Sequence, residues 1–167
     1  IKSIFKSYGF HFIIPPSIEF LDSLNTLEKD RSSNNNYFLT YDKNSNAALA
    51  FRSDITVQAA RIDSHILSYN KINKLYYQGK ILTSNLDDEK LTRETFQLGA
   101  EIFGTDNILC DIELQNILFE ILLKIKLKSF FYTIGHVGFL TRYEPIIISS
   151  GISLNSFYSS FKKRNKK

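Results

Sequence analysis

A single cysteine, Cys110, and a complete lack of tryptophan and methionine mark the composition of this chain of 167 residues. One thiol cannot form an internal disulfide, which excludes a small secreted domain held together by disulfide bonds. The cysteine and the three histidines also lack the spacing of zinc ligands. We therefore expect a reducing compartment, no metal and no cofactor.

Long apolar runs are absent as well. No stretch approaches the ~20 residues that a helix needs to cross a bilayer. Residues 1–8 carry two lysines but are too short for a signal peptide, and no glycine-rich phosphate loop is present. These absences predict a cytoplasmic protein with no membrane partner.

Positive charge is concentrated at one end of the chain. The net charge is +4, and much of the excess lies in the tail, at Lys162, Lys163, Arg164, Lys166 and Lys167. A basic cluster can contact nucleic acid, but at a chain end it is more often a solvated helix terminus. Because the rest of the chain is nearly balanced, we expect no nucleic-acid partner.

The overall composition, with 43% apolar and 23% charged residues, is typical of a globular protein. A chain of this length usually forms one domain with a hydrophobic core. We expect a single domain over residues 1–167 that ends in a basic helical tail at 153–167.

Hydrophobic spacing predicts that helices and strands are mixed along the chain. Helices are expected within residues 4–8, 18–24, 54–67, 106–127, 137–143 and 153–167, and strands at 10–14, 37–41, 47–51, 74–82, 92–103 and 130–134. Strands 74–82 and 92–103 form a long antiparallel hairpin around the polar loop 83–91. Antiparallel strands with helices grouped between them favour the α+β class.

The first unusual polar segment lies where the strand at 47–51 gives way to a helix. Arg52, Asp54 and Thr56 bring a cation, a carboxylate and a hydroxyl to that junction. Junctions of this kind often line binding sites. A helix cap with a salt bridge explains the same residues, and composition alone favours that second interpretation.

The second polar segment follows one face of the strand at 92–103. Alternation puts Arg93, Thr95, Gln97, Gly99 and Glu101 on the same face. Such a face is either exposed to solvent or the floor of a polar pocket. If it is a floor, Gly99 leaves room for a ligand. Gln97 and Glu101 can then accept hydrogen bonds from an amino group or an imidazole.

Several stretches resemble histidyl-tRNA synthetases and, more closely, their paralogues that regulate ATP phosphoribosyltransferase. They are FRSDITVQAARIDSHIL at 51–67, YYQGKILTSNLDDEKLTRETFQLGAEIFG at 76–104 and IGHVGF at 134–139. The opening FKSYGFHFIIPPSIEFLDSL at 5–24 resembles the first motif of class II synthetases, which builds their dimer interface. The resemblance implies a class II synthetase-like antiparallel sheet flanked by helices, in a shortened and incomplete domain that forms a homodimer.

The resemblance also implies a ligand site. In the synthetase family, residues at the positions of Asp54 and Thr56 hold the amino group of histidine. Those at the positions of Gln97 and Glu101 complete the amino-acid pocket, and Arg93 matches the start of the second hairpin strand. We expect these five residues to form a histidine-like ligand pocket.

One departure from the family pattern argues against catalysis. Class II synthetases hold the ATP α-phosphate with an arginine where this chain has Thr83. A hydroxyl cannot replace a bidentate guanidinium, and losing such a contact costs on the order of 10²-fold or more in rate. Lys80 lies at the wrong strand position to substitute. We therefore assign no catalytic residue.

The resemblance implies a regulatory, non-catalytic subunit of ATP phosphoribosyltransferase, the enzyme of the first step of histidine biosynthesis. Its partner would be the short-form catalytic subunit in a hetero-oligomer, and histidine would be the feedback effector. Two alternatives stay open. One is a truncated or degenerate histidyl-tRNA synthetase, and the other is a homodimeric remnant that only binds a ligand.

Overall fold

The computed structural model describes residues 1–24, 37–67, 71–84, 92–135 and 137–164. The chain divides into two compact units, Ile1–Leu127 and Lys128–Lys167, where the sequence predicts one domain. A single domain stays a prediction, because this division does not test whether the units fold independently. Most of the predicted hairpin loop at 83–91 lies outside the described residues.

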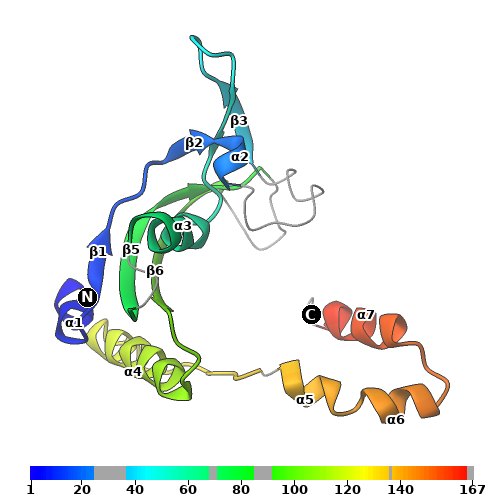
Figure 1. Ribbon diagram of the computed structural model, residues 1–167. Coiled ribbons are helices and arrows are strands. Elements are labelled where there is room, and N and C mark those ends of the chain that lie inside the picture. The colour runs from blue at the N-terminus through cyan, green and yellow to red at the C-terminus, as the bar shows by residue number, and fades with distance from the viewer. Residues whose placement is uncertain (25–36, 68–70, 85–91, 136, 165–167) are drawn as a thin grey trace. The chain divides into compact units, whose positions relative to one another are not determined.

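Two three-stranded sheets organise the first unit (Figure 1). The first sheet has the order β1 (His11–Ile13), β5 (Asn73–Leu82), β6 (Glu94–Phe103), and the second has the order β2 (Ile18–Phe20), β4 (Ala48–Phe51), β3 (Phe38–Tyr41). Strands β5 and β6 pair antiparallel over their full length, which confirms the predicted hairpin. Strand β1 pairs parallel to β5, an exception within an otherwise antiparallel arrangement.

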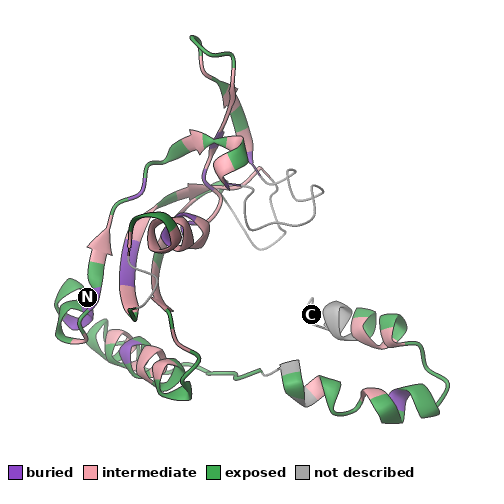
Figure 2. Ribbon diagram, viewed as in Figure 1, coloured by how far each residue is buried: buried purple, intermediate pink, exposed green. Residues whose placement is uncertain are grey.

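Helices cover both faces of the first sheet. On one face, α1 (Lys2–Ser7) and α4 (Ile108–Lys124) form a core with Tyr76. On the other face, α3 (Thr56–Ile66) forms a core with Tyr77. Successive strand residues point to opposite faces, so these neighbouring tyrosines serve separate cores. Figure 2 shows the buried middle of β5, and the α+β prediction is confirmed.

Two predicted elements are wrong. The spacing of Ile18, Leu21 and Leu24 predicts one helix, but Ile18–Phe20 forms β2 and only α2 (Leu21–Leu24) is helical. Pairing of β2 with β4 satisfies the backbone in place of helical hydrogen bonds. Residues 130–134, expected to be a strand, have no regular secondary structure and no pairing strand among the described residues.

The regular elements of the second unit are helices in its described part, and they follow residues 128–135, which have no regular secondary structure. The unit contains α5 (Val137–Thr141), α6 (Glu144–Ser149) and α7 (Leu154–Arg164). The Ser153 hydroxyl accepts a hydrogen bond from the backbone N–H of Ser156 at 3.2 Å and so caps the start of the last helix. The side chains of the basic tail at 162–167 lie outside the described residues.

Candidate functional site

The two polar segments meet where α3 begins above β6. The Gln97 amide nitrogen donates to Asp54 Oδ1 at 2.7 Å, and its oxygen accepts from the backbone N–H of Ile55 at 2.9 Å. These residues lie more than forty positions apart in the chain, at separations of 43 and 42. The β5–β6 hairpin thus brings the Gln97 side chain to the start of α3, as its strand face predicts.

Asp54 joins the helix start to the sheet. Besides Gln97, its Oδ1 accepts from the backbone N–H of Thr56 at 3.0 Å. That bond satisfies one of the N–H groups that a helix terminus leaves free. From the sequence, Asp54 could serve either the start of the helix or a binding site. In the structure its carboxylate does both, because the same oxygen accepts from the Thr56 backbone and from Gln97. No salt bridge to Asp54 occurs among the described residues.

Tyr77, which the sequence did not indicate as a site residue, links Thr56 to Glu101. Its hydroxyl donates to Glu101 Oε1 at 3.0 Å and lies 2.9 Å from Thr56 Oγ1. Because the phenol proton goes to Glu101, the Thr56 hydroxyl donates to the phenol oxygen. The register of the hairpin could have pointed to Tyr77, since it pairs Tyr77 with Gly99 between Gln97 and Glu101.

The ring of Tyr77 occupies the space beside Gly99. A Cβ atom at Gly99 would lie 2.4 Å from the Tyr77 Cζ and hydroxyl oxygen. The expectation that Gly99 leaves room for a ligand is therefore wrong in one respect, because the tyrosine ring fills that room. Tyr77 is itself 2% exposed, so its hydroxyl reaches the polar cluster from a buried ring.

The Tyr77 hydroxyl is held in its protonated form. Burial of the ring is the main cause that raises the pKa of Tyr77 above its ordinary value, and the nearby Glu101 carboxylate raises the pKa further. The hydrogen bond from Thr56 acts in the opposite direction. Tyr77 therefore acts as a hydrogen-bond donor that fixes the Glu101 carboxylate.

Arg52 has a structural role beside this cluster. It is 5% exposed, and its guanidinium donates to the carbonyl oxygens of Pro15 at 2.7 Å and Lys80 at 2.9 Å. Gly79 makes this possible, because a Cβ there would lie 2.2 Å from Arg52 Nη2. Burial lowers the pKa of Arg52 below its ordinary value, although Glu19 opposes this change. Arg52 thus ties the end of β4 to β5 and to the chain after β1.

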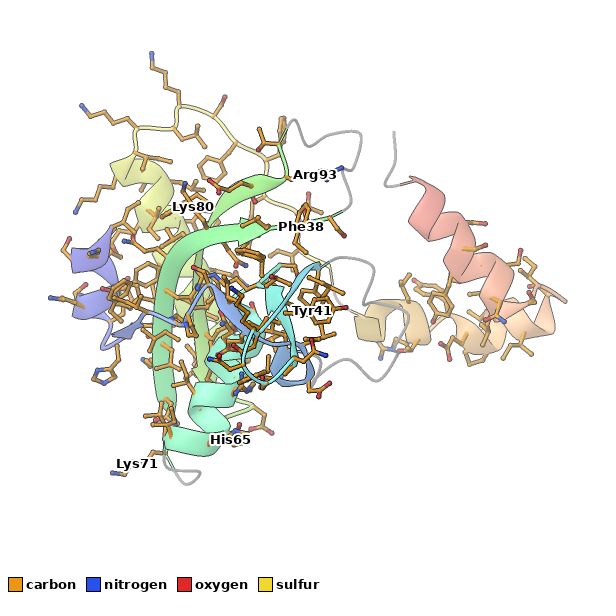
Figure 3. The ribbon with its side chains drawn as sticks, turned by 90° about the horizontal axis from the view of Figure 1, so that it is seen from above. Phe38, Tyr41, His65, Lys71, Lys80 and Arg93 are labelled. Carbon is orange, nitrogen blue, oxygen red and sulfur yellow. The ribbon has the colours of Figure 1, made fainter. Side chains whose placement is uncertain are left out.

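Arg93 lies apart from the other predicted site residues. It is exposed at the end of the hairpin next to the connecting loop, and its guanidinium carbon lies 5.6 Å from the centre of the Phe38 ring (Figure 3). None of the contacts described for Arg93 joins it to Asp54, Thr56 or Gln97. Arg93 precedes β6, and its side chain packs on an aromatic ring.

Thr83 stands at the position where, by the resemblance, class II synthetases carry the arginine that holds the ATP α-phosphate. Thr83 follows β5, and its backbone N–H donates to the Arg93 carbonyl at 3.0 Å. Its side-chain oxygen is buried and has no hydrogen-bond partner among the described residues. Lys80 forms an ion pair with Glu94 at 2.6 Å. Lys80 and Thr83 are three positions apart, so along a regular strand their side chains point to opposite faces of the sheet.

Comparison with known proteins decides the family. A sequence model of the family described as histidyl-tRNA synthetase matches residues 1–150. The chain belongs to the histidyl-tRNA synthetase family. Within the described residues, no helix of this family member could span a bilayer, and no group of three or more His, Cys, Asp and Glu side chains could hold a metal ion.

Curated relatives of this family member include ATP phosphoribosyltransferase regulatory subunits. The one from Saccharophagus degradans is 35% identical over 153 residues, which are 92% of this chain and 38% of the relative. The one from Thiobacillus denitrificans is 36% identical over 141 residues, which are 83% of this chain and 43% of the relative. The chain thus spans about two-fifths of the length of these relatives.

Solved structures of synthetase-like proteins share the fold. An ATP phosphoribosyltransferase regulatory subunit/histidyl-tRNA synthetase from Bacillus halodurans has a TM-score of 0.72 at 23% identity, over 84% of this chain and 36% of that chain. The pyrrolysyl-tRNA synthetase of Desulfitobacterium hafniense has a TM-score of 0.65 at 14% identity, over 81% of this chain and 46% of that chain. These likenesses confirm the class II synthetase-like fold predicted from the sequence.

Proposed function

We propose that the chain is a regulatory, non-catalytic subunit that acts with the short-form catalytic subunit of ATP phosphoribosyltransferase in the first step of histidine biosynthesis. The observation that carries this proposal has two parts. The polar residues expected to line the amino-acid pocket lie in one hydrogen-bonded cluster, whereas Thr83 stands where class II synthetases carry the arginine that holds ATP. The names of the relatives at 35% and 36% identity support the same assignment.

The chemistry of the cluster suits the ammonium group of an amino acid. Asp54 and Glu101 are both half-buried, and neither carboxylate has an ion-pair partner within the described part of the chain. A partly buried carboxylate without a cation is stabilised when an ammonium or imidazolium group binds to it. Thr56 and Gln97 add a hydroxyl and an amide at hydrogen-bonding distance from these acids. Histidine, whose ammonium group is a cation and whose imidazole can donate a hydrogen bond, is the effector that we propose for this site.

A synthetase needs an arginine that holds the ATP α-phosphate, and the lack of that arginine distinguishes the proposed regulatory subunit from a synthetase. A threonine hydroxyl offers one donor and no charge, whereas an arginine offers a charged bidentate fork. Lys80 is held by Glu94 on the other face of the sheet. The chain therefore binds an amino acid without binding ATP in a reactive geometry. A degenerate histidyl-tRNA synthetase is the alternative, and it predicts ATP-dependent activation of histidine.

A homodimer within the hetero-oligomer is part of the proposal. The segment after α1 exposes large apolar side chains, with Ile14 at 78%, Phe20 at 52% and Ile18 at 40% exposure. Apolar side chains exposed so close together in sequence suit an interface between two copies. The cytoplasmic location expected from the sequence stays a prediction.

The test of the function is reconstitution. The chain is mixed with a short-form ATP phosphoribosyltransferase catalytic subunit, and the rate of joining ATP to phosphoribosyl pyrophosphate is measured with and without histidine. We expect the two proteins to co-purify, the chain to raise the rate and histidine to lower it. Failure to co-purify would overturn the proposal. Histidine-dependent exchange of pyrophosphate into ATP by the chain alone would instead favour the synthetase alternative.

A further inference from the structure

A cavity lies between α3 and the chain that follows β1. Its volume is about 320 Å³, and it is lined by residues 14–16 and Glu19 on one side and by α3 on the other. Small-molecule sites have volumes of ~300–1,000 Å³. His65, which also lines the cavity, marks this part of α3 in Figure 3. Within the described part of the chain, the polar cluster around Tyr77 contributes no residue to the lining, so the cavity is a separate place to bind a ligand.

Much of the cavity wall is apolar and open to solvent. Ile14 is 78% exposed and Ile66 is 74% exposed, and they line the cavity from its two different segments. Ile62 adds a third apolar side chain from α3. Apolar surface is stabilised when another apolar group covers it and removes it from water. The cavity therefore favours a ligand that has an apolar part.

Gln58 brings an unpaired hydrogen-bond acceptor to the lining. The residue is 2% exposed, and its amide nitrogen donates to the Pro16 carbonyl at 2.8 Å, which fixes the orientation of the amide. The amide oxygen, Oε1, is buried and accepts no hydrogen bond from any residue that the structure describes. A buried acceptor without a partner is unfavourable. A ligand that brings an N–H donor would satisfy it.

An ion pair lines the cavity beside these groups. Arg61 Nη1 lies 2.7 Å from Glu19 Oε2, and the two side chains are 31% and 19% exposed. The other N–H groups of the Arg61 guanidinium have no acceptor among the described residues. A guanidinium binds a carboxylate through paired N–H groups, and a carboxylate accepts hydrogen bonds from an ammonium group. A cation and an anion side by side therefore match a small ligand that carries both charges.

We propose that this cavity is a second binding site, which takes a free α-amino acid with an apolar side chain, such as leucine. The carboxylate of the ligand pairs with Arg61, and its ammonium group donates to Glu19 and to the unpaired oxygen of Gln58. The apolar side chain covers Ile62 and the two exposed isoleucines. Only a free amino acid carries both charges on one carbon atom, which distinguishes it from a peptide. The proposal does not depend on the regulatory function or on the proposed histidine site.

Titration of the isotope-labelled chain with L-leucine, followed by NMR, tests the site. We expect the side-chain amide signal of Gln58 to shift and to saturate below about 10 mM leucine. Leucinamide lacks the carboxylate and 4-methylpentanoate lacks the ammonium group, so each should bind at least about tenfold more weakly than leucine. An excess of histidine should not displace leucine, because the cavity and the polar cluster share no described residue.

Matched variants locate the contacts. Ile66→Asp puts a charge on the apolar wall and should weaken leucine binding by about tenfold or more. Phe96→Asp is the control, because Phe96 is 66% exposed on β6 and does not line the cavity, and it should leave the affinity unchanged. Arg61→Gln removes the cation, so it should weaken leucine by about tenfold or more while leaving the affinity for leucinamide unchanged.

Three results would overturn the proposal. The first is no saturable shift of the Gln58 signal with leucine. The second is equal binding of leucine, leucinamide and 4-methylpentanoate, which would identify an unspecific apolar hollow. The third is a shift of the same signal that follows the concentration of the chain without any leucine, which would identify a second copy of the chain as the occupant.

Discussion

Tyr77 and Gly99 face each other across the β5–β6 hairpin, and the tyrosine ring occupies the place of the side chain that Gly99 lacks. From there the Tyr77 hydroxyl holds Glu101 and meets Thr56. A glycine on one strand thus determines where a carboxylate on the same strand points. Gly99 affects Glu101 through Tyr77 on the neighbouring strand, so the effect depends on the register of the hairpin.

Replacing Gly99 with alanine should destabilise the fold. The added Cβ would lie 2.4 Å from atoms of the buried Tyr77 ring, which must shift. Overpacking of this kind costs about 1–3 kcal/mol of unfolding free energy. Gly135→Ala is the control, because a Cβ there meets nothing within 4 Å. Urea unfolding of both variants checks this, and equal losses in the two would contradict the packing that we describe.

The pKa of Tyr77 predicts a pH dependence of stability. Because this pKa is raised in the folded state, the protonated phenol stabilises the fold below the unfolded value of about 10. That contribution is lost as the pH rises toward the folded pKa. Tyr77→Phe should therefore be less stable than wild type at pH 8, by about 1 kcal/mol for the lost hydrogen bonds. The difference should narrow above pH ~10. If the difference in unfolding free energy between wild type and Tyr77→Phe stays constant from pH 8 to 11, the raised pKa of Tyr77 is refuted.

Arg52→Lys should show how much the buried guanidinium contributes. A lysine ammonium cannot reach both the Pro15 and Lys80 carbonyls in the fork geometry of an arginine. The unpaired carbonyls should cost about 1–3 kcal/mol. Arg61→Lys is the matched control, since Arg61 forms a more exposed ion pair with Glu19 at 2.7 Å and should lose less than about 1 kcal/mol. Thermal unfolding compares the two, and equal effects would contradict the structural role of Arg52.

Ile14→Asp tests the proposed homodimer. Ile14 is 78% exposed, so a charge there should disrupt a twofold contact without entering the core. Phe12 is a poorer choice, because its ring lies 4.9 Å from the Tyr76 ring within the first core. Sedimentation velocity should give a dimer for wild type and a monomer for the variant, with unchanged circular dichroism. A wild-type monomer, or a variant that still dimerises, would exclude this interface.

The hairpin and the polar cluster were predictable because both depend on strand alternation. Gln97 and Glu101 share a face in any regular strand, and the resemblance identified Asp54 and Thr56 as their counterparts. Tyr77 was not predictable in the same way, because its position depends on which residue pairs with Gly99. That pairing is fixed only when both hairpin strands have a known register.

The wrong predictions concern segments whose secondary structure depends on whether another strand pairs with them. Ile18–Phe20 has helical spacing with Leu21 and Leu24, but pairing with β4 made it a strand. Residues 130–134 have the composition of a strand and are not one. Strand propensity reflects fit to neighbouring strands more than an intrinsic backbone preference. The contact between Arg93 and Phe38 also had no signal in the sequence, because Phe38 comes from the other sheet.

Calorimetric titration of histidine into wild type and Glu101→Gln tests the amino-acid site most directly. The glutamine can still accept the hydrogen bond from Tyr77, so the fold should keep its melting temperature while the site loses a negative charge. Wild type should bind histidine at one per chain, and Glu101→Gln should bind it about tenfold or more weakly. Equal affinities in the two proteins, or no binding by wild type, would contradict the claim that these polar residues form a histidine site.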